Sequence, residues 1–405
     1  MKDKTKFLPL LGVYIFIVLL ASSNDFQGDQ KDYIWFAQNL SHGYYSPPEE
    51  INLWFGPGYP IVLLPFVLLK LPWLLARLAN PIFLFLAFLF FNATLRFYMK
   101  ERMALIFTYV LALYPPFLGH IHWLDPEKLA IFLVCAFLFF FCKTQHNKRP
   151  YWPSLLAASV SLGYLALTKV FFGYVIFSGF ILFLFLFLWK RKDTLKKAFL
   201  VYSFALIFCL PYLSYTYSLT GKFFYWGNSG GLSLYWMSSP YPNELGSWQS
   251  VQQVFKMPEL SKNHEEFFDK LSKLSTIQKD EALKKQAIYY IVHNPRSYFR
   301  NWLANVGRLV FNYPYSFAPQ LLSTYFYVIP NIFLVVFCFI CFYFSYIGRK
   351  LIPDEISASL IFALISFGGS SLLSAYNRQF MPIVPVLILW ISFTLVHLIK
   401  IQIRK

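Results

Sequence analysis

The ionisable side chains of this sequence that could do chemistry lie between long apolar runs. The first is Asp29, which opens a stretch where Asp29, Tyr33, Ala37 and Leu40 follow a helical spacing. A carboxylate at the start of a helix is stabilised by free backbone N–H groups and by the helix dipole. Asp29 therefore has two interpretations. It is a helix cap or a solvated acid in a loop, or it is a carboxylate that takes part in chemistry.

A second acidic site occurs in the segment HIHWLDPEKLAIF, where Asp125 and Glu127 flank Pro126. Proline is favoured in the first turn of a helix, so both acids stand where the next apolar helix begins. They are either helix caps, or a second acid or metal ligand. His120 and His122 could join Asp125 at a metal, although two histidines at this spacing are a weak signal.

Two cations also stand in apolar surroundings. Lys169 lies in GYLALTKVFFGY between two apolar runs, and Arg378 lies in SAYNRQFMPIVP before the last run. A lysine in such a place is costly unless it reaches water or an anion. Lys169 therefore either snorkels to the membrane surface or points inward, where it is a natural partner for a phosphate group.

The composition requires a membrane as the solvent for most of the chain. Of the 405 residues, 57% are hydrophobic and 14% are charged, against about 25% charged residues in soluble proteins. A water-soluble fold of this length could not hide so much apolar surface. The net charge of +17 comes from short basic clusters between apolar runs. Clusters in these places are typical of signals that orient a membrane protein, so no nucleic-acid partner is expected.

The elements that must position these residues are membrane-spanning helices. Runs approaching 20 apolar residues predict an all-α polytopic membrane protein with about ten spans. Basic clusters precede the first span and follow every second one, which places both termini in the cytoplasm and 14 of the 19 carboxylates outside. The expected spans are 7–22, 75–95, 104–119, 128–142, 153–169, 171–189, 198–218, 324–346, 356–374 and 380–398.

These spans divide the chain into three parts. An N-terminal transmembrane module covers 1–218 and contains the first external loop, 23–74. Within that loop, 57–74 is apolar but interrupted by prolines, which predicts a juxtamembrane helix along the outer interface. Residues 219–323 are too many for a simple loop and predict a small external domain. C-terminal transmembrane helices fill 324–405.

Seven short motifs occur along the chain in a characteristic order. They are D-x3-Y-x3-A-x2-L-x2-G from Asp29, GPGYP from Gly56, LDPEKLAIFLV from Leu124, LTKVFF from Leu167, SGGLSLYW from Ser229, HNPRSYF from His293 and RQFMPIVP from Arg378. Together they resemble the GT-C superfamily of membrane glycosyltransferases. The branch they resemble most holds the lipid A aminoarabinose transferases and the protein O-mannosyltransferases. The resemblance extends over nearly the whole chain.

The resemblance implies a sugar donor linked to a polyprenyl phosphate, an acceptor glycosylated on the external face, and no nucleotide cofactor. It implies that Asp29 is the catalytic acid of the first external loop. Lys169, with Arg378, is then expected to bind the donor phosphate. Asp125, with Glu127 beside it, matches the acid of the second loop, which is either a second acid or the ligand of a divalent metal cation.

The same resemblance gives Asp32 and Tyr33 supporting roles in the first loop. Two departures from the family pattern occur nearby. Gln30 follows Asp29 where some members carry a second acid, and Gly56-Pro57 stands where the aminoarabinose branch has a phosphate-binding lysine-proline. The sugar and the acceptor therefore cannot be carried over.

The sequence thus predicts an inverting glycosyltransferase in a membrane, which we expect to be a bacterial inner or plasma membrane. Asp29 would act as the general base toward a hydroxyl of a lipid, glycan or protein acceptor, while the cations stabilise the leaving phosphate. The alternatives are a lipid or solute transporter or flippase, and a scaffold that binds the lipid carrier without catalysis. The transferase interpretation requires Asp29, Asp125 and Lys169 to line one cavity.

Overall fold

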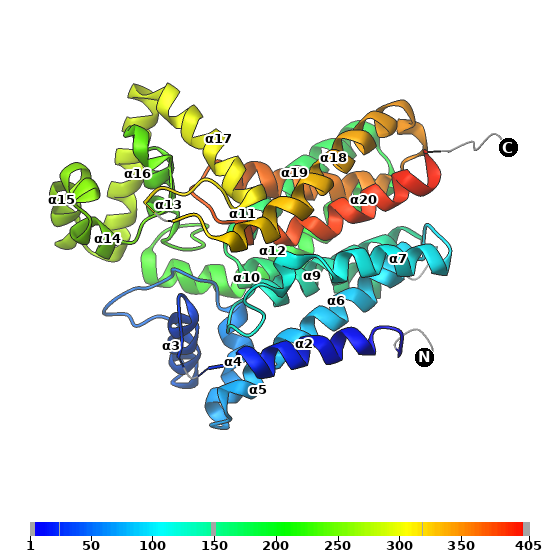
Figure 1. Ribbon diagram of the computed structural model, residues 1–405, viewed down its shortest axis with the longest axis horizontal. Coiled ribbons are helices and arrows are strands. Elements are labelled where there is room, and N and C mark those ends of the chain that lie inside the picture. The colour runs from blue at the N-terminus through cyan, green and yellow to red at the C-terminus, as the bar shows by residue number, and fades with distance from the viewer. Residues whose placement is uncertain (1–4, 24, 147–150, 318, 400–405) are drawn as a thin grey trace.

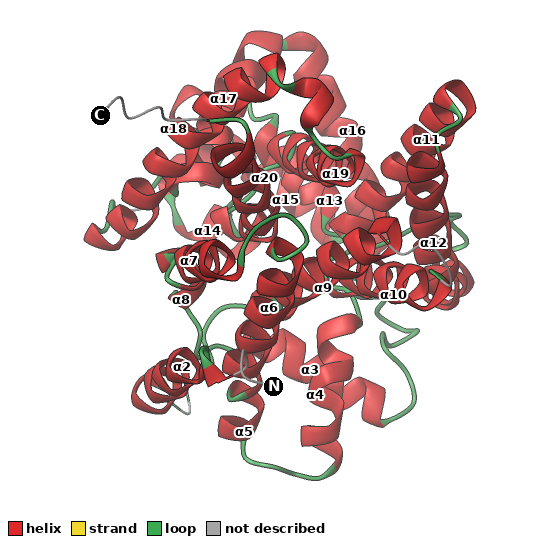
Figure 2. Cartoon of the chain, turned by 90° about the vertical axis from the view of Figure 1, so that its right-hand side faces the viewer, coloured by secondary structure: helices red, strands yellow, loops and turns green. Residues whose placement is uncertain are grey.

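Helices are the regular secondary structure of this chain in the part that the structure describes. The computed structural model describes residues 5–23, 25–146, 151–317 and 319–399, and no strand occurs among them (Figures 1 and 2). The all-α class predicted from the sequence is therefore confirmed.

Within these described ranges, six helical stretches are long and apolar enough to cross a membrane. This length and composition confirm an integral membrane protein. The stretches are Trp73–Leu95, Glu127–His146, Phe171–Lys190, Asp193–Thr220, Leu322–Ile347 and Asn377–His397. They contain α6 (Ala79–Leu95), α9 (Glu127–His146), α11 (Phe171–Lys190), α12 (Asp193–Thr220), α18 (Tyr325–Ile347) and α20 (Val384–His397).

The other four expected spans fall on helices that are shorter or less apolar. The span expected at 104–119 shows one physical reason, because Pro115 and Pro116 stand inside it. A residue before proline disfavours the helical conformation, and Tyr114 is indeed extended, which separates α7 from α8. The helices in question are α2 (Leu8–Ala21), α7 (Glu101–Ala112), α8 (Pro115–Leu118), α10 (Trp152–Thr168) and α19 (Asp354–Ser371).

The helices differ in how deeply they lie in the bundle. The stretch containing α9 is 67% buried and the stretch containing α20 is 78% buried, whereas that containing α18 is only 11% buried. α9 packs against α6 and α10, and α12 covers α10 and α11. The inner helices α9 and α20 therefore provide rigid supports for polar groups at their N-terminal ends, while α18 exposes its apolar side chains.

The described part of the first loop, 23–74, contains α3, α4 and the start of α5. α3 packs on α4 through Tyr33, whose ring centroid lies 5.2 Å from that of Tyr59 and 4.5 Å from that of Phe55. The helix expected over 57–74 is divided, because Pro72 stands between α4 and α5. The three helices are α3 (Gln30–Ser41), α4 (Gly58–Leu68) and α5 (Trp73–Arg77).

Segment 219–323 has a hydrophobic core of its own, in which Leu232 and Trp236 meet Leu260 and Phe268. Its main helices are α13 (Gly230–Met237), α14 (Val251–Lys256), α15 (Pro258–Ser272), α16 (Thr276–His293) and α17 (Pro295–Phe311). α3 and α14–α16 lie at one end of the molecule, and the start of α2 and the end of α20 lie at the other (Figure 1).

Candidate functional site

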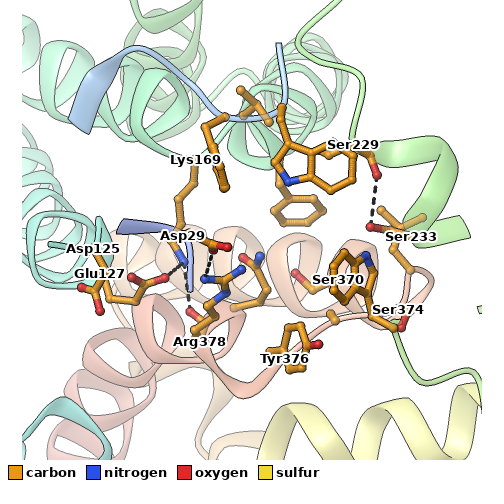
Figure 3. Close-up of a pocket in the computed structure, with 18 of the residues that line it drawn as sticks. Asp29, Asp125, Glu127, Lys169, Ser229, Ser233, Ser370, Ser374, Tyr376 and Arg378 are labelled. Carbon is orange, nitrogen blue, oxygen red and sulfur yellow. Dashed lines mark hydrogen bonds and ion pairs between the residues drawn. The ribbon is translucent and has the colours of Figure 1, made fainter. Parts of the chain in front are cut away.

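A cavity of about 820 Å³ lies where α3, the starts of α9 and α11, α13 and the segment 370–379 meet (Figure 3). The expectation that Asp29, Asp125 and Lys169 share one cavity is confirmed. Asp32 is not part of the lining. The candidate residues that do line the cavity are Asp29, Tyr33, Asp125, Glu127, Lys169 and Arg378.

Asp29 and Arg378 form an ion pair across the cavity, although 349 positions separate them in the sequence. Asp29 occupies the N-cap position of α3, but its side chain makes no capping hydrogen bond. Its Oδ2 instead accepts a hydrogen bond from Arg378 Nη1 at 2.6 Å. Asp29 therefore stands at the helix start, as expected, but does not cap the helix through its side chain. Because the two side chains remain 32% and 37% exposed, a ligand in the cavity can reach both.

Lys169 points into the protein rather than toward the membrane surface. It ends α10 in an extended conformation and is buried. Its Nζ lies 2.9 Å from Glu127 Oε1 and donates a hydrogen bond to the carbonyl oxygen of Arg378 at 3.2 Å. The snorkelling interpretation is therefore wrong. Lys169 instead links α9 to the segment that carries Arg378.

Asp125 has a cation partner that the sequence analysis missed. Lys128 is fully buried, and its Nζ lies 3.3 Å from both carboxylate oxygens of Asp125. The same ammonium donates to the carbonyl oxygens of Gly119 and His120. The separation of three residues at a helix start was a signal that could have identified this pair.

Burial raises the pKa of the Asp125 carboxyl to about 8, against the opposing effect of Lys128. A proton on Asp125 near neutral pH suits a second acid better than a metal ligand, because metal ligands bind in their deprotonated form. Burial also raises the pKa of Tyr33 well above its usual value, so its hydroxyl stays protonated and can donate a hydrogen bond.

The side chains do not fit a metal site. Across the described part of the chain, no group of three His, Cys, Asp or Glu side chains could hold a metal ion. The Asp125 carboxylate faces Lys128, and the His120 ring packs on Trp123 with centroids 4.1 Å apart. Ligation of a divalent cation by Asp125 therefore finds no support in the donor set, and the chemistry below uses none.

The stability of the fold should depend on pH through Asp125. The folded chain holds a proton on this carboxyl that the unfolded chain releases above a pH of about 4. The contribution of Asp125 to stability is thus fully present at low pH and is lost as the pH rises through about 8. We expect melting temperatures measured between about pH 5 and 8 to vary less for Asp125→Asn than for the wild type. Equal pH dependence in both proteins would contradict this expectation.

The motif GPGYP has a packing role that the sequence analysis did not identify. A Cβ atom on Gly56 would lie 2.0 Å from the carbonyl oxygen of Leu167, and one on Gly58 would lie 2.6 Å from Thr168 Oγ1. Only residues without a side chain allow this approach. The start of α4 therefore packs directly on the backbone that precedes Lys169 and holds that lysine in place.

Gly58→Ala should lower the free energy of unfolding by about 1–3 kcal/mol, because the added methyl group meets backbone atoms that cannot move aside. Gly12→Ala is a matched control, since a Cβ atom at Gly12 in α2 meets nothing within 4 Å. Thermal melts of both variants test the prediction. It fails if Gly58→Ala melts at the wild-type temperature.

The apolar helices and the cavity lined by ionisable side chains define a polytopic membrane protein with a polar interior site. No protein-family model matches the sequence, and no curated protein does. Among solved structures, the archaeal oligosaccharyltransferase AglB from Archaeoglobus fulgidus, in complex with an inhibitory peptide and a dolichol-phosphate, matches 97% of this chain at 14% identity with a TM-score of 0.54.

A second structure of that oligosaccharyltransferase, tethered to an acceptor peptide, matches 96% of this chain at 14% identity with a TM-score of 0.52. ArnT from Cupriavidus metallidurans, bound to undecaprenyl phosphate, matches 96% of this chain and 78% of its own at 13% identity, with a TM-score of 0.44. This chain spans about half the length of AglB, namely 50% and 49% in the two structures. This chain therefore shares the fold of the helical part of AglB that it matches.

Proposed function

We propose that this protein transfers a glycosyl group from a polyprenyl-phosphate-linked donor to a hydroxyl group of an acceptor. One observation carries the proposal: a carboxylate and two cations from distant segments, Asp29, Lys169 and Arg378, meet in a cavity large enough for a ligand. The GT-C fold supports it, because AglB was solved with a dolichol-phosphate.

The charges of the cavity fit a phosphate group. Three cations of the site each pair with one acid. Lys128 pairs with Asp125, Lys169 with Glu127, and Arg378 with Asp29. With Asp125 protonated, which its raised pKa favours near neutral pH, three cations face two carboxylates. One positive charge then remains for the donor phosphate, and charge-assisted hydrogen bonds would hold it.

In the proposed reaction the acceptor hydroxyl oxygen attacks the anomeric carbon, and the bond between that carbon and the phosphate oxygen breaks. Asp29 takes the hydroxyl proton as general base. The electron pair of the broken bond stays on the phosphate, where Arg378, held by Lys169, stabilises the negative charge. The donor phosphate competes with Asp29 for Arg378 and so frees the carboxylate for its role. A single displacement of this kind inverts the anomeric centre.

The proposal places the cavity on the external face of the membrane. Nucleotide sugars are cytoplasmic, so an external transferase needs a donor carried through the membrane by a lipid. The basic clusters favour the same orientation, with ten spans, cytoplasmic termini and the three-part division at 218 and 323. The acceptor in this proposal is a lipid, a glycan or a protein with a free hydroxyl group.

Reconstitution into liposomes tests the proposal against its rivals. The probes are undecaprenyl phosphate carrying a radiolabelled hexose and a mixture of hydroxyl acceptors from bacterial envelopes. Transfer predicts release of undecaprenyl phosphate together with label in the acceptor fraction. A flippase predicts that the label crosses the bilayer with its phosphate bond intact. A non-catalytic scaffold predicts neither result, and either of these two outcomes would overturn the proposal.

A further inference from the structure

The cavity has two ends of different chemical character. Asp29, Asp125, Glu127, Lys169 and Arg378 form the ionic end. The opposite end, here called the neutral end, carries hydroxyl groups and aromatic rings, and Figure 3 shows Ser229, Ser233 and Ser374 of this end apart from the ionic group. The neutral end consists of Trp226, Ser229, Ser233, Ser370, Ser374 and Tyr376.

Two buried polar atoms of the neutral end have no protein partner in the described structure. They are Ser370 Oγ and Trp226 Nε1, in side chains that are 4% and 0% exposed. A buried hydrogen-bonding group without a partner costs about 1–3 kcal/mol, so nearly all such groups in proteins are paired. Because both side chains line the cavity, a ligand in it can supply the missing partners.

The aromatic rings of the neutral end lead toward the ionic end. The Tyr376 ring lies 6.3 Å from Trp248 and stacks on Tyr315 at 5.9 Å, between centroids. The Arg378 guanidinium carbon lies 5.8 Å from the centroid of the same Tyr376 ring. An aromatic ring beside hydroxyl and N–H groups suits a sugar, whose C–H face packs on the ring while its hydroxyl groups form hydrogen bonds.

The charge at the neutral end is already compensated. Lys284 also lines the cavity, but its Nζ lies 2.6 Å from Asp280 Oδ2. The other oxygen of that carboxylate accepts a hydrogen bond from the backbone N–H of Gly231 at 2.7 Å, beside Ser229 and Ser233. A charged sugar would therefore find no free opposite charge among the described residues of this end.

We infer that the neutral end binds the glycosyl group of the donor and that this group is an uncharged sugar, such as a neutral hexose or an N-acetylhexosamine. The inference rests on the proposed function for the identity of the donor. The phosphate lies at the ionic end, next to Tyr376, which is the member of the neutral end that approaches Arg378. A site built to hydrogen-bond hydroxyl groups rejects ligands that lack them, so Ser370 and Trp226 determine which sugar-lipid is bound.

Equilibrium binding in nanodiscs separates the two ends of the cavity. The probes are undecaprenyl phosphate alone and undecaprenyl phosphate carrying glucose, galactose, mannose or N-acetylglucosamine. The wild type should bind the best of these sugar-lipids more tightly than the bare lipid. Ser370→Ala should weaken that binding up to about tenfold, the effect of one hydrogen bond, and leave the bare lipid unchanged. The variant removes no hydrogen bond within the described structure, so it should fold normally.

Ser366→Ala is the matched control, one turn earlier in α19. Ser366 is equally buried, but its hydroxyl donates to the carbonyl oxygen of Phe362 at 2.8 Å and does not line the cavity. The Ser366→Ala variant should change neither the affinity for the sugar-lipid nor the affinity for the bare lipid. Trp226→Phe, which keeps a ring but removes the N–H group, should act as Ser370→Ala does.

The inference is overturned if the wild type binds no sugar-lipid more tightly than the bare lipid. It is also overturned if Ser370→Ala and Trp226→Phe leave the preference intact, or if undecaprenyl phosphate carrying an amino sugar or a uronic acid binds best. These results are separate from turnover. A selective binder without transfer would contradict the proposed function alone, and transfer with unselective binding would contradict this inference alone.

Discussion

Asp29→Asn is expected to lower the rate of glycosyl transfer by about 10²–10⁴-fold, the range for loss of a well-placed general base. An asparagine side chain keeps an oxygen that can accept the hydrogen bond from Arg378, but it cannot take a proton from the acceptor hydroxyl. Because Asp29 is partly exposed and does not cap α3, the substitution should leave the melting temperature almost unchanged. The measurement is the initial rate of label transfer in liposomes.

Asp25→Asn is the matched control for this experiment. Asp25 lies four residues before Asp29, carries the same kind of side chain and is exposed outside the lining of the cavity, so the rate of this variant should stay close to that of the wild type. A fully active Asp29→Asn protein would remove Asp29 from the role of base. Equal losses in both variants would indicate a general effect of charge near the start of α3.

The polar residues of the cavity could be predicted because the rest of the chain is so apolar. A charged group between apolar runs must reach water or an opposite charge, so the positions of Lys169 and Arg378 were informative by themselves. Hydrophobic run length similarly predicted the helical membrane class. The count of ten spans stays a prediction, because four of the expected spans fall on helices that are shorter or less apolar, one of them divided at Pro115.

Contacts between residues far apart in the chain could not be predicted from sequence spacing, because spacing gives local geometry only. Asp29 stands where helix caps are common, and only the folded chain brings Arg378 to it. The close approach of Gly58 to Thr168 also depends on segments far apart in the sequence. Ser370 resembles any small polar residue of an apolar helix until its hydroxyl is found without a partner.

The ion pair between Lys169 and Glu127 should dominate the stability of the site. Both side chains are less than one-tenth exposed, at 8% and 5%, so removing one leaves a buried charge without its partner. Lys169→Met and Glu127→Gln should each lower the free energy of unfolding by about 3–5 kcal/mol. The double variant should recover most of this loss, because no isolated charge remains. Denaturant or thermal unfolding of all four proteins, in one detergent, measures the coupling.

Lys192→Met provides the comparison for an exposed pair. Lys192 lies 3.2 Å from Asp354, with the two side chains 54% and 39% exposed, so its loss should cost at most about 1 kcal/mol. If the two single losses at Lys169 and Glu127 simply add in the double variant, the pair is not coupled in the folded protein. A double variant that recovers its stability but transfers no sugar would show that this ion pair contributes to the reaction beyond its effect on stability. Lys169 holds the backbone of Arg378, so losing this lysine while the fold is kept isolates that positioning role.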